Sequence, residues 1–108
     1  MTKARASEAF DLLKAGREKE ARAILEAIVR DDMADAAVLE TLGDVREKLG
    51  DKAGALDAYA GAVTHLKARG DGRRALGVLE LMLLVDDKNV WARVEGAECR
   101  WELSDDAG

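Results

Sequence analysis

The chain contains no proline, one cysteine and one histidine. Average proteins carry about 5% proline, so its absence favours uninterrupted helices. One cysteine cannot form a disulfide within the chain, so Cys99 suits a reducing compartment and we expect a cytoplasmic protein. A lone histidine without neighbouring cysteines offers no common zinc site, and we expect neither metal nor cofactor.

Long apolar runs and an excess of positive charge are also missing. No stretch approaches the roughly 20 apolar residues that span a bilayer, and the charged N-terminal segment does not resemble a secretory signal. The formal net charge is −5. An acidic chain of this kind is not expected to bind nucleic acid or a membrane surface.

The residues that are abundant predict an all-α protein. Alanine, leucine, glutamate, lysine and arginine dominate, and all are good helix formers. Glycine and aspartate interrupt the chain at intervals, which leaves six expected helices near 3–15, 18–30, 36–49, 53–68, 73–86 and 90–103. The links are short, so successive helices should pack antiparallel.

Part of the sequence repeats at an interval of 34 residues. The repeated positions are Gly16 and Gly50, Ala21 and Ala55, and Leu25 and Tyr59. Glycine permits a tight turn between helices without a Cβ penalty. Alanine then lets two helices approach closely, and the large residue fills the space one turn further on.

These positions resemble the tetratricopeptide repeat family. Residues 36–69 match best, because Leu39, Leu42 and Gly43 stand where the first helix of that repeat has W-x-x-L-G. Residues 2–35 match less fully, and the closing proline of the family is absent. The resemblance implies a right-handed solenoid of helical hairpins within a single domain over residues 1–108.

The repeat changes phase after residue 69. Residues 70–89 read as a short unit with a second helix only, so the helix over 53–68 is a candidate to serve in two hairpins. Residues 90–108 read as a partial unit. Its last six residues, from Leu103, resemble in sequence the turn at Leu49–Gly54. We expect a piece of a longer repeat protein; the alternative is that the last helix is an improvised cap.

The resemblance also implies a binding face, since the first helices of such repeats line the concave side of the solenoid. The side chains it places there are Phe10, Leu13, Lys14, Glu40, Asp44, Glu47, Trp91 and Trp101. Their acidic and apolar character suits a protein segment with basic and apolar residues. The expected function is a protein–protein interaction scaffold without catalysis, and the Ala/Arg/Gly/Asp-rich composition suggests a bacterial source.

A second interpretation is structural. The helix over 73–86 is apolar almost all round, so either the short unit buries it or it meets another chain. The second case predicts a homodimer through Leu81, Leu84 and Trp101. No catalytic constellation is expected, because the aspartate pairs at 31–32, 86–87 and 105–106 fall where helix caps and turns are expected.

Overall fold

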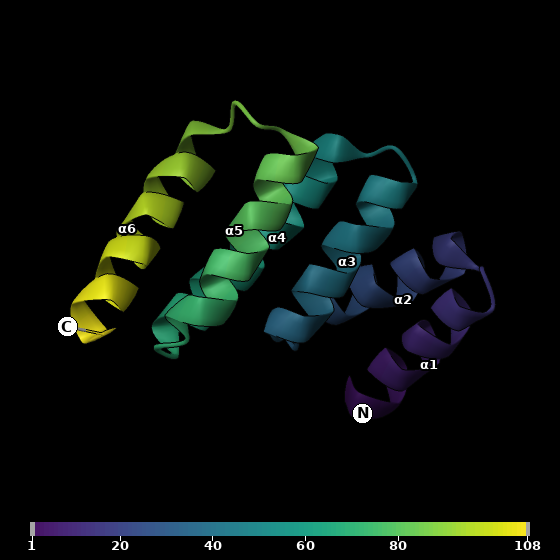
Figure 1. Ribbon diagram of the computed structural model, residues 1–108. Helices are drawn as coiled ribbons and strands as arrows, with labels where there is room; N and C mark the ends of the chain where they lie inside the picture. Colours follow the sequence, from purple (N-terminus) through teal and green to yellow (C-terminus); the bar gives the residue numbers. More distant parts are fainter. Residues whose placement is uncertain (1, 108) are drawn as a thin grey trace.

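The computed structural model describes the backbone of residues 2–107 and the side chains of residues 4–104. This part of the chain is helical throughout, apart from short turns (Figure 1). The helices are α1 (Thr2–Lys14), α2 (Glu18–Arg30), α3 (Ala36–Lys48), α4 (Lys52–Ala68), α5 (Gly72–Val85) and α6 (Val90–Ala107). The all-α prediction is confirmed. The expected end of the last helix at residue 103 is wrong, because α6 continues to Ala107.

Three of the turns share one glycine-based geometry. Gly16, Gly50 and Gly70 have φ values of 77°, 84° and 75°. Positive φ is inexpensive only for glycine. The residue after each glycine donates its amide hydrogen to a carbonyl in the last turn of the preceding helix. The three pairs are Arg17 to Leu12, Asp51 to Arg46 and Asp71 to Leu66, at 2.8, 2.8 and 2.9 Å. This hydrogen bond closes the C-terminus of the preceding helix and reverses the chain at once.

Aspartate and asparagine shape the other two turns. Asp32, between α2 and α3, takes a positive φ of 55°, a conformation that aspartate tolerates better than most residues. Asp35 caps α3 by accepting from the Val38 amide at 2.9 Å, and Asn89 caps α6 by accepting from the Ala92 amide at 2.8 Å. The pairs at 31–32 and 86–87 therefore lie in turns, as expected. The pair at 105–106 lies within the backbone of α6, and its side chains are outside the described part.

Helix α4 belongs to two hairpins. The Gly50 turn folds it against α3 and the Gly70 turn folds α5 against it, and it packs extensively on both neighbours. Ala55 and Ala75, which follow these two turns, are completely buried and let the helices approach closely. Because α3 and α5 are both antiparallel to α4, they run parallel to each other.

The interior consists of two apolar clusters. The N-terminal cluster joins α1, α2 and α3, while the C-terminal cluster joins α4, α5 and α6. Ala36 of α3 belongs to the second cluster and Ala58 of α4 to the first, so the α3–α4 hairpin connects them. Each helix packs chiefly on its neighbours in sequence, within overall extents of 44 × 29 × 22 Å (Figure 1).

Candidate functional site

A hollow of about 270 Å³ lies between α3 and α5, with α4 beneath it. Its lining residues are Asp44, Glu47, Tyr59, Leu81, Leu84 and Val85. The shared helix explains this arrangement: two parallel helices that both pack on α4 leave a channel between them. We call this hollow the α3–α5 groove.

Tyr59 of α4 lies at the base of the groove and is almost fully buried. Its ring occupies the space above Gly43 of α3, where an added Cβ would lie 2.6 Å from a ring carbon. Its hydroxyl donates a hydrogen bond to the Asp44 carboxylate. Burial raises the pKa of Tyr59, and the hydrogen bond and negative charge of Asp44, followed by Glu47 and Glu40, raise it further. The phenol therefore stays neutral at physiological pH and fixes the Asp44 side chain.

The α3 wall of the groove carries negative charge. Glu40, Asp44 and Glu47 follow one another at helical spacing, which puts them on one side of α3. In the described part of the chain, none of these carboxylates forms an ion pair. α3 and α5 also both end here, and the C-terminus of a helix carries partial negative charge. α5 has no basic residue in its last turn to offset it, whereas the last turn of α3 carries Arg46 and Lys48.

The α5 wall is apolar. Leu81 and Val85 are partly buried against the C-terminal cluster. Leu84 is 83% exposed. Of the two alternatives considered for this helix, burial within the chain therefore holds for most of its apolar residues, and Leu84 is the exception.

The sequence-predicted site residues do not all meet. Asp44, Glu47, Leu81 and Leu84 line the groove, and Glu40 lies near enough to act on the Tyr59 hydroxyl. Three predicted residues are on α1: Leu13 packs in the N-terminal cluster, Phe10 is half-buried, and Lys14 is exposed.

The two tryptophans are on α6, which packs on α5 and lies at the end of the row of helices (Figure 1). Trp91 is 40% exposed and Trp101 is 75% exposed. Leu84 faces the groove with α3, whereas Trp101 lies on the side of α6 away from α5. The predicted self-association residues therefore do not form one surface.

Sequence reasoning missed Tyr59 and Val85 as groove residues. Tyr59 was expected only as the large residue of the repeat, although a buried tyrosine normally needs a partner for its hydroxyl. That partner, Asp44, is 15 residues away. No local spacing rule connects two positions so far apart on different helices.

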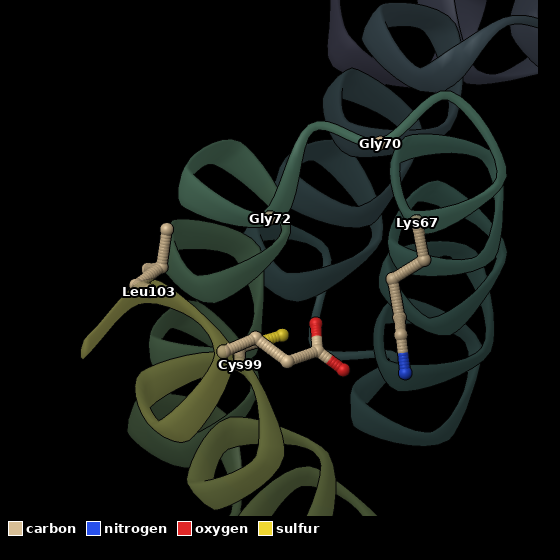
Figure 2. Close-up of a pocket in the computed structure, with 6 residues that line it drawn as sticks. Lys67, Gly70, Gly72, Cys99 and Leu103 are labelled. Atoms are coloured by element: carbon tan, nitrogen blue, oxygen red, sulfur yellow. The ribbon is translucent and has the colours of Figure 1, made fainter. Parts of the chain in front are cut away.

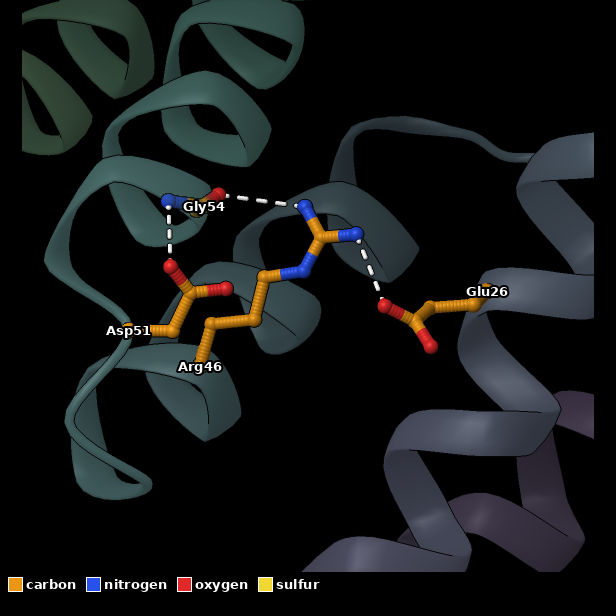
Figure 3. A network of polar contacts seen from close by, with 4 residues as sticks. All are labelled: Glu26, Arg46, Asp51 and Gly54. Carbon is orange, nitrogen blue, oxygen red and sulfur yellow. Dashed lines mark hydrogen bonds and ion pairs between the residues drawn. The ribbon is translucent and has the colours of Figure 1, made fainter.

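A polar network fixes the position of the α3 wall (Figure 3). The Arg46 guanidinium donates to Glu26 of α2 at 2.9 Å and to the Gly54 carbonyl of α4 at 3.1 Å. Asp51 accepts from the Gly54 amide at 2.9 Å and so caps the same end of α4. One side chain of α3 therefore connects the helices on both sides of it.

A smaller cavity of about 120 Å³ lies between the α4–α5 turn and α6 (Figure 2). Cys99 is at its wall and is 1% exposed. Burial raises the pKa of the Cys99 thiol, which disfavours the reactive thiolate. Lys67, on the opposite side, is paired with Glu95. The cavity therefore presents neither an activated nucleophile nor a free cation.

Among the described side chains, those of residues 4–104, no group of three or more histidine, cysteine, aspartate or glutamate residues could hold a metal ion. No helix between residues 2 and 107 combines the length and apolarity needed to cross a membrane. No protein-family model matches the chain. A search of curated proteins finds no significant relative.

Proposed function

We propose that the chain is a helical-repeat module of the tetratricopeptide type, arranged as a right-handed solenoid, that binds a segment of another protein and performs no catalysis. Two features support the repeat: the shared geometry of the Gly16 and Gly50 turns, and the complete burial of Ala21 and Ala55 behind them. The free, buried Cys99 suits a reducing, cytoplasmic location.

The α3–α5 groove carries the proposal. It combines a wall of carboxylates that form no ion pair in the described part of the chain with an apolar wall on which Leu84 is almost fully exposed. An amphipathic segment with apolar residues on one side and lysine or arginine beside them complements both walls. Contact with Leu84 supplies much of the affinity, while Asp44 and Glu47 steer the approach.

A labelled amphipathic peptide with leucine and lysine at helical spacing tests this proposal. Its affinity is measured by fluorescence anisotropy for the wild type, for Asp44→Asn/Glu47→Gln and for Leu84→Ser. We expect each variant to bind at least about tenfold more weakly, which corresponds to about 1.4 kcal/mol. The amide substitutions conserve side-chain size and Leu84 is 83% exposed, so both variants leave the buried clusters intact and helicity measured by circular dichroism should not change.

The matched control is Glu8→Gln/Asp11→Asn, which removes the same charge from exposed positions of α1. It should bind the peptide nearly as well as the wild type at physiological salt. If both double variants lose affinity equally, the peptide responds to net charge alone and the groove is not the site. Unchanged binding by Leu84→Ser would equally contradict the proposal.

A further inference from the structure

The outer side of α6 carries an exposed apolar stripe. Its members are Val90, Val94, Ala97 and Trp101. Val90 is 72% exposed, Val94 51% and Trp101 75%. Their spacing of four, three and four residues keeps them in one line, as in the seam of a coiled coil. We call this line the α6 stripe.

The opposite side of α6 is already occupied. Ala92 and Cys99 are buried and face α5. Because α6 ends the row of helices in Figure 1, no other helix of the described chain covers its stripe. A helix that is apolar on two opposite sides is normally covered on both. Contiguous exposed apolar patches of this kind mark interaction surfaces.

The charges beside the α6 stripe indicate what covers it. Arg93 and Arg100 lie along one edge and Glu98 along the other, and all three are exposed. In a parallel pair of helices, each Arg93 lies next to Glu98 of the other copy. In an antiparallel pair, each Arg93 would instead lie next to Arg100. The surface therefore complements itself in the parallel arrangement only.

Glu98 is accessible for such a pair. Its contact within the chain, to Lys67, is long at 3.9 Å, and its side chain remains 58% exposed. The cation nearest to it in the chain, Lys67, is committed mainly to Glu95. An arginine from a second copy can therefore approach Glu98 without breaking a close ion pair.

We propose that two copies of the chain associate through their α6 stripes, in parallel, about a two-fold axis along α6. Val94 then meets Val94 and Trp101 meets Trp101, and a β-branched residue at the Val94 position favours two-stranded pairing. The other helices extend away from the axis, so the α3–α5 groove stays open. One helix from each copy forms an interface below the standard size of about 1,600 Å², so the dimer dissociates on dilution.

Sedimentation equilibrium over a range of concentrations tests the surface. The wild type should pass from monomer to dimer as concentration rises. Val94→Glu should weaken dimerisation at least about tenfold, because it places like charges opposite each other in the seam. Leu84→Glu, a matched change on α5 outside the stripe, should dimerise as the wild type does, which separates this proposal from binding in the groove.

Charge reversal tests the parallel direction. Arg93→Glu alone and Glu98→Arg alone should each weaken the homodimer, because like charges then meet across the axis. A mixture of the two variants should associate more tightly than either alone, because every pair becomes attractive again. In the antiparallel arrangement this rescue would not occur.

Disulfide trapping gives a second measurement of direction. Ala97→Cys, in a Cys99→Ala background, should form a covalent dimer with oxidised glutathione, because the parallel axis brings the two residues together. Ala23→Cys, at an exposed site on α2, should not. A wild type that stays monomeric at high concentration overturns the proposal, as does dimerisation that Val94→Glu leaves unchanged. Monomers throughout would indicate that another protein covers the α6 stripe.

Discussion

Gly43 and Tyr59 together shape the α3–α5 groove. Gly43 leaves the space that the Tyr59 ring fills, and the ring in turn places its hydroxyl at Asp44. The buried part of the tyrosine holds α3 and α4 together, while its polar end orients a carboxylate at the surface. Packing of α3 on α4 and the position of the Asp44 carboxylate therefore depend on the same two residues.

Titration of Tyr59 checks its environment. It is the only tyrosine, so absorbance at 295 nm reports its ionisation alone. In the folded protein the midpoint should lie above the value of about 10 for unperturbed tyrosine. Burial and the Asp44, Glu47 and Glu40 carboxylates cause this rise in pKa. The native state then binds the proton more tightly than the unfolded chain. The resulting stability is complete below pH 10 and is lost as the pH rises through the folded pKa.

Asp44→Asn should lower the midpoint of this titration, because it removes a negative charge and keeps a hydrogen-bond acceptor. The chain unfolded in guanidinium chloride is the control and should titrate near the unperturbed value. A folded wild type that titrates at the same pH as the unfolded chain would contradict the placement of Tyr59.

Gly43→Ala tests the close approach of α3 and α4. Its Cβ would lie within 3 Å of three Tyr59 ring carbons, and overpacking of this kind costs about 1–3 kcal/mol. Gly77→Ala on α5 is the matched control, because it is exposed and an added Cβ meets nothing within 4 Å. That control should gain about 0.5–1 kcal/mol from helix propensity. Urea unfolding followed by circular dichroism measures both. Stabilisation by both substitutions would disprove the close contact.

At the scale of the helix, the residues at which a helix begins and ends depend largely on local sequence. How the helices pack on one another does not. Glycine turns, aspartate caps and apolar spacing predicted the first five helices to within one residue at each end. The predicted end of the last helix at Leu103 was wrong. That prediction relied on the similarity of this segment to the turn at Leu49–Gly54 and not on the conformational preference of the individual residues. Position 104 is serine, which does not favour the positive φ that Gly50 adopts.

Arg46 tests how one helix holds its neighbours. Arg46→Met should destabilise the protein by about 1–2 kcal/mol, because it removes two charge-assisted hydrogen bonds that are partly shielded from solvent. Arg17→Met is the control, since Arg17 pairs with Glu20 on the surface. It should change the free energy of unfolding by less than about 0.5 kcal/mol. Equal effects in denaturant unfolding would show that Arg46 acts only as a surface charge.

At the scale of the whole molecule, the sequence predicted which residues are buried better than which surfaces they create. Ala21, Ala55 and the large residues after them are buried as their repeat positions predicted. The groove was not foreseen as a whole, because it depends on α5 returning beside α3 across a shared α4. Asp44 and Leu84 are 40 positions apart in sequence, and no periodicity within a helix relates them.

The order of packing has a consequence for how the chain folds. Because each helix packs chiefly on its neighbours in sequence, every docking step closes only a short loop and loses little chain entropy. Topologies dominated by such local contacts fold quickly. The chain also has no proline, so no slow cis–trans isomerisation can delay the last steps. Docking of α4 on α3, which brings Tyr59 to Gly43, therefore has to close only the short turn at Gly50.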